Sequence, residues 1–335
     1  HERSYRLPWR PFVARMVSAV ATLGTGAPQG LEGPSMYAGA TLGSNVQRHV
    51  PLIFRDAERR VLLVAGAAAG VAAIFKAPAT GAVFALEVPY QDDLARRMLL
   101  PALTASASGY LAFVIVHGTA PLFPIDGTIH LELRDLLGAI AVGIICGLGA
   151  RGFAWMLGRA KRIAGTTPHF LTSLVAGLVL GGLFLLGRLL TGQSLLVGAG
   201  YQVVTWAADP GRAVWVLLAI LAMRCLATSA AVAGGGGGGL FIPLVVAGAI
   251  VGSLIGSAVN HHDLTLFIVI GVAAFLGAGY RVPLASVMFV AETTGRPSFI
   301  VPGLFAAVAA ELMMGTASVT KYQRATTGPF ERPEP

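Results

Sequence analysis

Long apolar segments separated by short polar breaks make up most of the chain. We place them at about 12–24, 33–46, 61–75, 79–88, 98–117, 136–158, 170–191, 213–233, 240–259, 264–278, 283–292 and 299–316. A helix needs about 20 apolar residues to cross a bilayer, and several of these segments are shorter. Glycine or proline interrupts many of them, which is typical of transporters whose half-helices meet at mid-membrane. The pattern predicts an all-α polytopic membrane protein with broken and half-spanning helices.

The composition agrees with residence in a membrane. Hydrophobic residues make up 55% of the 335 residues and charged residues only 12%, against about 25% charged in ordinary soluble domains. This excludes a disordered chain, a nucleic-acid-binding protein and an ordinary cytosolic enzyme. The net charge of +8 comes from Lys and Arg between the apolar segments, as in loops at a membrane surface. Cys146 and Cys225 lie in apolar segments, so neither a disulfide framework nor a metal site is expected.

Two pairs of segments match, in the same order, in the two halves of the chain. Residues 30–44 read GLEGPSMYAGATLGS and residues 239–253 read GLFIPLVVAGAIVGS. Residues 66–87 read GAAAGVAAIFKAPATGAVFALE and residues 271–292 read GVAAFLGAGYRVPLASVMFVAE. We infer an internal duplication within a single transmembrane domain, 1–335, with a first repeat at about 10–117 and a second at about 135–325. The spacing does not tell whether the repeats are inverted or parallel.

Part of the repeated pattern predicts structure rather than function. Glycines four residues apart, at 39 and 43 and again at 248 and 252, predict helices that pack closely. Glu87 and Glu292 are equivalent in the two repeats, and each follows a proline by nine residues. We expect both carboxylates near helix ends, as caps or as hydrogen-bond partners of loops.

Glycine-rich stretches run into a helix start in both repeats, at Gly24–Pro34 and Gly234–Pro243. A helix N-terminus presents unpaired backbone N–H groups and about half a positive charge. At membrane depth it is suited to hold a dehydrated anion. Neither stretch contains Lys or Arg, so dipoles would hold the ion weakly enough for it to leave again. The alternative is a turn that serves packing alone.

Glu32 lies inside the first of these stretches, and an ionisable residue at membrane depth indicates function. Its carboxylate can take the place of the anion, blocking the path when docked and opening it when protonated or displaced. The alternative is a carboxylate that only caps its helix. Phe241 holds the equivalent position in the second repeat, so the duplication keeps one such acid.

At these residues the sequence resembles the CLC family of chloride channels and chloride/proton exchangers. Residues 30–34, GLEGP, resemble the family's G-x-E-G-P motif, and residues 239–243, GLFIP, resemble its G-x-F-x-P motif. Residues 66–78 resemble its G-A-A-A-G segment, which ends in A-P. The resemblance runs from about residue 10 to residue 326. It implies an inverted-repeat membrane fold, a homodimer with one pore in each subunit, and no cofactor.

The resemblance also implies roles for particular residues. Glu32 would be the gating glutamate. Tyr322, whose place after the last apolar segment alone indicates an interfacial anchor, would donate its hydroxyl to the central ion. The backbone amides expected to face chloride are those around Gly33 and at Leu240, Phe241 and Ile242. The residues that shape the two motifs are Gly30, Pro34, Gly239 and Pro243.

The chain departs from the family in four places. The family's early helices are absent, and so is the segment whose serine caps the central anion site in the family. We do not expect Thr25 to replace that serine. We therefore expect a truncated member that conducts poorly by itself. Val88 stands where exchangers of the family typically carry a proton-transfer glutamate and several channels carry Val. Lys76 stands where many members have an uncharged polar residue. The chain ends soon after Tyr322, so no cytoplasmic CBS domains are expected.

These features predict a passive chloride channel of the voltage-gated type, gated by Glu32, because Val88 cannot relay a proton. The alternative is a chloride/proton antiporter with another inner proton route. An intramembrane enzyme would need a second polar partner beside Glu32 or Glu87, and a cation-coupled carrier would need more acids within the spans. The intact E-G-P pattern favours chloride over fluoride. We expect a non-enzymatic protein of the bacterial inner membrane whose partners are chloride, lipid and a second copy of itself.

Overall fold

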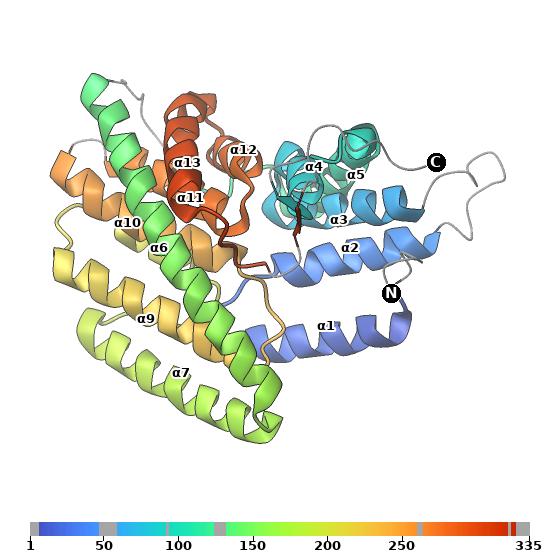
Figure 1. The fold of residues 1–335 in the computed structure, drawn as a ribbon, viewed down its shortest axis with the longest axis horizontal. Coiled ribbons are helices and arrows are strands. Elements are labelled where there is room, and N and C mark those ends of the chain that lie inside the picture. The colour runs from blue at the N-terminus through green and yellow to red at the C-terminus, as the bar shows by residue number, and fades with distance from the viewer. Residues whose placement is uncertain are drawn as a thin grey trace.

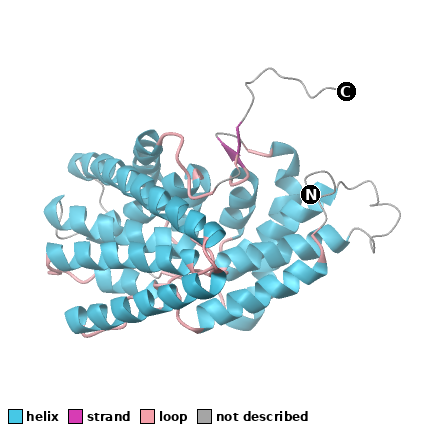
Figure 2. Cartoon of the chain, turned by 60° about the horizontal axis from the view of Figure 1, so that its bottom comes forward, coloured by secondary structure: helices cyan, strands magenta, loops and turns pink. Residues whose placement is uncertain are grey.

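The computed structural model describes residues 7–46, 59–91, 94–123, 132–259, 264–320 and 323–325. Their secondary structure is almost entirely helical, as Figures 1 and 2 show. The α-helices of the described residues are α1 (Trp9–Gly24), α2 (Glu32–Val46), α3 (Arg59–Phe75), α4 (Pro78–Glu87), α5 (Leu99–His117), α6 (Leu133–Thr166), α7 (His169–Thr191), α8 (Tyr201–Ala207), α9 (Val214–Ala233), α10 (Phe241–Val259), α11 (Leu264–Tyr280), α12 (Pro283–Thr294) and α13 (Ile300–Met314).

Short 3-10 helices precede two of them, η2 (Arg96–Met98) before α5 and η4 (Pro297–Phe299) before α13. Two strands of two residues each, β1 (Tyr90–Gln91) and β2 (Arg324–Ala325), pair in parallel at one edge of the molecule (Figure 2). The predicted all-α architecture is therefore confirmed, with this one small addition.

Six of the described helices are long and apolar enough to cross a bilayer, namely α5 with η2, α6, α7, α9, α10 and α13 with η4. The helices α3 and α11 are apolar but shorter. Large apolar side chains also point outward, and Phe170 is 82% exposed and Leu189 77% exposed on α7. Such a surface suits lipid and not water, so the chain is an integral membrane protein.

The buried centre of the molecule is formed by α10 and α11. Every residue of α11 except Thr265 is buried, and most of α10 is buried as well. The two helices approach so closely that a Cβ at Gly248 would overlap the carbonyl oxygen of Gly271. In the first repeat, a Cβ at Gly39 of α2 would overlap the carbonyl oxygen of Gly66 of α3. The predicted close packing at these glycines is confirmed.

The two repeats meet at a short antiparallel bridge between equivalent glycines. The N–H of Gly30 donates to the carbonyl of Gly239 at 2.9 Å, and the N–H of Gly239 donates to the carbonyl of Gly30 at 2.7 Å. Equivalent residues that exchange equivalent hydrogen bonds are related by a two-fold axis. From this bridge α2 and α10 run in opposite directions (Figure 1). The repeats are therefore inverted, which the sequence spacing left open.

The same symmetry governs the two repeated glutamates. Glu292 of α12 accepts hydrogen bonds from the backbone N–H groups of Ala79 and Thr80 at the start of α4, at 2.8 and 2.7 Å, and from the Thr80 hydroxyl. Glu87, at the end of α4, accepts from the N–H groups at the equivalent positions of α12, at 3.2 and 2.9 Å. Each glutamate thus caps the helix of the other repeat, so the expectation that they are caps is confirmed.

Glu292→Ala should destabilise the fold, because three donors at the start of α4 lose their acceptor inside an apolar structure. Each buried donor left without a partner costs about 1–3 kcal/mol. We expect a clearly lower midpoint for the loss of monodisperse protein when the detergent-solubilised protein is heated. Asp209→Ala, at an exposed position after α8, is the control. A Glu292→Ala protein that melts together with this control would contradict the capping role.

Candidate anion-binding site

Two glycine-rich loops, residues 25–31 and 234–240, meet where α2 and α10 begin. The side chains that join them come from the first repeat. The side-chain oxygen of Gln29 accepts from the N–H of Gly238 at 3.2 Å, and the hydroxyl of Thr22 accepts from the N–H of Gly237 at 3.1 Å. Together with the glycine bridge, these bonds fix the second loop against the first.

The helix starts approach each other closely because glycine occupies both sides. A Cβ at Gly33, in the first turn of α2, would lie 3.2 Å from the Cα of Gly239. That separation is tighter than ordinary contact, so a side chain would push the two loops apart. The structure therefore brings the predicted GLEGP and GLFIP motifs together in one place, as expected.

The Glu32 carboxylate is docked at the start of α10. The side chain is only 3% exposed, and its Oε1 accepts from the N–H of Phe241 at 2.5 Å. The N–H of Ile242 also lies within interaction range. We call the backbone N–H groups of Leu240, Phe241 and Ile242 the α10 amide site. These groups lie at the positive end of the helix dipole, where a negative charge is stabilised.

The second carboxylate oxygen of Glu32 is held less firmly. Glu32 Oε2 is buried and has no hydrogen-bond partner among the described residues. The carboxylate also leaves no spare room, because a Cβ at Gly30 would overlap Oε2 and a Cβ at Gly239 would overlap Oε1. The structure thus places the Glu32 carboxylate at a helix start, where an anion was expected to bind. A gating role for that carboxylate goes beyond this geometry.

Arg224, inside the apolar helix α9, anchors the surroundings of the site. Its guanidinium donates to the carbonyls of Leu195, Gly198 and Ala199 at 3.2, 3.1 and 2.6 Å. The N–H of Gly198 in turn donates to the carbonyl of Gly26 in the Glu32 loop at 2.8 Å. Sequence reasoning missed Arg224, although a lone arginine inside an apolar segment is itself a signal of a special role.

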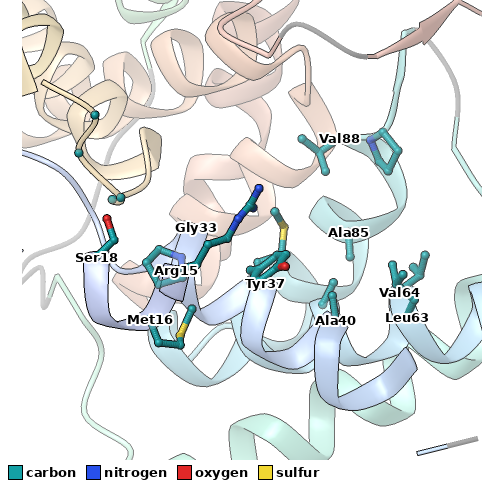
Figure 3. A pocket seen from close by; sticks show the side chains of 18 residues that line it. Arg15, Met16, Ser18, Gly33, Tyr37, Ala40, Leu63, Val64, Ala85 and Val88 are labelled. Atoms are coloured by element: carbon teal, nitrogen blue, oxygen red, sulfur yellow. The ribbon is translucent and has the colours of Figure 1, made fainter. Parts of the chain in front are cut away.

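A cavity of about 640 Å³ reaches the start of α2 (Figure 3). It lies between α1, α2, α3, the end of α4 and glycines 235–238, and Gly33 forms part of its wall. Arg15 extends along it with its Cζ 4.4 Å from the centroid of the Tyr37 ring. Its lining contains this positive charge and no carboxylate of the described residues. Such a cavity attracts anions.

Val88 lies on the wall of the same cavity, just after α4. Its carbonyl accepts from the Nε2 of Gln323 at 3.1 Å, and the same nitrogen donates to the carbonyl of Tyr280 at 2.6 Å. Tyr322 lies outside the described residues, so its contact with chloride stays a prediction. Its neighbour Gln323 ties this part of the chain to the ends of α4 and α11.

The comparison that decides the family covers nearly the whole chain. The family model described as "Voltage gated chloride channel" matches residues 1–315. This chain belongs to the CLC family. The recognition based on the two proline motifs is therefore confirmed.

Curated relatives are proton-coupled exchangers by name. The chain is 29% identical over 320 residues to the "H(+)/Cl(-) exchange transporter ClcA" of Klebsiella pneumoniae (strain 342). The matched region covers 91% of this chain and 66% of that relative. The protein of the same name from Citrobacter koseri is 28% identical with the same coverage. The chain thus spans just under two thirds of the length of these relatives.

Solved structures with the same fold include two antiporters. A "CLC-type fluoride/proton antiporter" superposes with a TM-score of 0.83 at 22% identity, covering 96% of this chain and 79% of the other. A "slow cyanobacterial Cl-/H+ antiporter" gives a TM-score of 0.78 at 22% identity, covering 92% and 73%. The predicted CLC-type fold is confirmed by these superpositions.

Gly30→Ala should displace the Glu32 carboxylate, because the new methyl group takes the place of Oε2. Once its competitor is removed, chloride should bind the α10 amide site about tenfold more tightly at neutral pH, the value of one hydrogen bond to a charged group. Isothermal titration and the cryo-EM density of Glu32 measure these two effects.

Gly177→Ala is the matched control, since open space surrounds that glycine of α7. A Gly30→Ala protein with Glu32 still docked and with unchanged chloride affinity would show that the carboxylate does not compete with the ion.

Proposed function

We propose that the protein moves chloride across the membrane in exchange for protons, along a path that passes the start of α10. The docking of Glu32 Oε1 on the N–H of Phe241 carries this proposal. A carboxylate and a chloride ion both need these N–H groups, so they compete for them. Protonation removes the charge and weakens the hydrogen bond. Binding of a proton to Glu32 therefore favours binding of chloride.

The chloride contacts follow from this competition. The backbone amides of Gly33, Leu240, Phe241 and Ile242 would bind the ion once the carboxylate has left, and Tyr322 would add its hydroxyl. Partial charges hold an ion strongly enough to bind and weakly enough to release. Arg15, in the cavity beside Gly33, would raise the local concentration of chloride without binding it at the site.

Exchange is better supported than the passive channel that Val88 suggested. The named relatives are H⁺/Cl⁻ exchange transporters, and two proteins of the same fold are antiporters. Passive conduction remains the second candidate because Val88, on the cavity wall, has no group that carries a proton. Exchange would require that protons reach Glu32 by a route that does not use position 88.

We further propose that the protein works as a homodimer in a bacterial inner membrane. The relatives named above are bacterial. The outer faces of α5 and α13 carry large exposed apolar side chains, such as Ile115 at 81% and Leu312 at 72% exposure. A second copy or lipid would cover them.

The proposed exchange is tested in liposomes that contain the reconstituted protein. A chloride gradient is imposed, the voltage is clamped with a potassium ionophore, and chloride and external pH are recorded together. We expect a chloride flux with opposed proton movement in a fixed ratio, and a small one, because the chain spans just under two thirds of the length of its exchanger relatives. Chloride flux without proton movement would establish the passive channel instead, and no protein-dependent chloride flux would contradict both candidates.

Glu32→Gln separates chloride transport from its pH dependence in the same assay. In the unsubstituted protein, chloride transport should rise as the pH falls, because protonation frees the α10 amide site. The glutamine is neutral at every pH, so the variant should keep chloride flux, lose this pH dependence and stop proton movement. Asp209→Asn is the charge-matched control. A normal pH profile in the Glu32→Gln protein would exclude Glu32 as the gate.

A further inference from the structure

Five aromatic rings gather around the start of α10. The Phe241 ring centroid lies 4.5 Å from that of Phe75, 4.8 Å from Phe289, 5.4 Å from Phe84 and 6.3 Å from Tyr280. The duplication relates these rings in pairs, with Phe84 equivalent to Phe289 and Phe75 equivalent to Tyr280. Tyr280 is thus the one ring of the five that carries a polar atom.

The Tyr280 ring lies beside the α10 amide site, with its centroid 6.3 Å from that of Phe241. Its side chain is 9% exposed, and its ring stands edge-on to Phe84 with the centroids 5.5 Å apart. The hydroxyl is within interaction range of the N–H of Leu240 and of the Glu32 carboxylate. Packing alone does not require this hydroxyl, because Phe75 fills the equivalent position in the first repeat without one.

Two differences between the repeats therefore converge on one place. Glu32 replaces the phenyl ring that Phe241 carries in the second repeat, and Tyr280 replaces the phenyl ring that Phe75 carries in the first. In a duplicated scaffold, features common to both halves build the fold, whereas features of one half are free to serve function. Both polar groups meet at the start of α10 and so belong to the same site.

We propose that the Tyr280 hydroxyl is a ligand of the transported anion, donating its proton to the chloride ion that replaces the Glu32 carboxylate at the α10 amide site. A phenol can accept one hydrogen bond while it donates another. The N–H of Leu240 would hold the oxygen as acceptor and leave the O–H for the ion. This inference rests on the proposed function, because it adds a ligand to the same site.

Tyr201 offers an internal comparison. Its hydroxyl is also within electrostatic range of Glu32, and its ring lies beside Phe123 at the start of α8, with the centroids 6.0 Å apart. Among the described residues the Tyr201 ring packs on Phe123 and not on Phe241, unlike the ring of Tyr280. If Tyr280 acts only through the charge of Glu32, its substitution by Phe should affect chloride affinity as Tyr201→Phe does. If the Tyr280 hydroxyl binds the anion, the two substitutions should differ.

The test is the chloride dissociation constant of the full chain, measured by isothermal titration in detergent. Tyr280→Phe removes the hydroxyl and keeps the ring. It is made in the unsubstituted protein and in Glu32→Gln, where the carboxylate charge is absent. We expect Tyr280→Phe to raise the dissociation constant about tenfold in both backgrounds, as for the loss of one hydrogen bond to an ion. Tyr110→Phe, on α5, should change nothing, and Tyr201→Phe should change it less than twofold in Glu32→Gln.

Three results would be decisive against the proposal or its foundation. Unchanged chloride affinity of Tyr280→Phe in both backgrounds would overturn it. An effect present only when Glu32 is intact would make the hydroxyl a partner of the carboxylate and would also overturn it. Absence of chloride binding in both parent proteins would instead contradict the proposed function.

A second measurement needs no substitution of Tyr280. In crystals of the Glu32→Gln protein soaked in bromide, we expect an anomalous peak within hydrogen-bond distance of both the Tyr280 hydroxyl and the α10 amides. A bromide peak at those amides but distant from the hydroxyl would reject Tyr280 as a ligand.

Discussion

Backbone N–H groups at a helix start need an acceptor, and within a membrane water does not supply one. The structure meets this constraint with carboxylates at three buried helix starts. Glu292 and Glu87 cap α4 and α12 through both of their oxygens. Glu32 caps α10 through one oxygen, and its Oε2 has no partner among the described residues. The first two use both oxygens as caps, whereas the third leaves one oxygen unpaired, and in the proposed function it is this carboxylate that chloride replaces.

The inverted duplication creates this arrangement. Only a two-fold relation lets Gly30 and Gly239 pair with each other and sends α2 and α10 outward from one point. The glycine contacts between α2 and α3 and between α10 and α11 pack the helices of each repeat closely. This close packing positions the α10 amide site and the aromatic rings around it. In the proposed function, only the Glu32 side chain has to move to free the site.

Much of the fold and of the candidate site could be predicted from the sequence, because the same prolines, glycines and glutamates recur at the same spacing in both halves. The motifs at residues 30–34 and 239–243 predicted the family, the duplication and the meeting of the two loops. Spacing carries no direction, so the inversion needed the Gly30–Gly239 bridge. Sequence reasoning did not select Tyr280 or Arg224. Tyr280 is one of several aromatic residues in the repeated segments, and Arg224 is a single charge inside an apolar helix. Val88 indicated a channel, whereas the names of the relatives favour exchange. The residue at one position is a weak guide here, because protons can reach Glu32 by a route that does not use it.

The central claim is that a carboxylate and chloride compete for the α10 amide site, and proton uptake tests it most directly. Chloride is added to weakly buffered protein near neutral pH, and the change in proton concentration is recorded. The account predicts that the protein takes up protons as chloride binds, because the displaced Glu32 carboxylate becomes protonated, and that Glu32→Gln takes up none. Chloride binding without proton uptake in the unsubstituted protein, or equal uptake in Glu32→Gln, would contradict it.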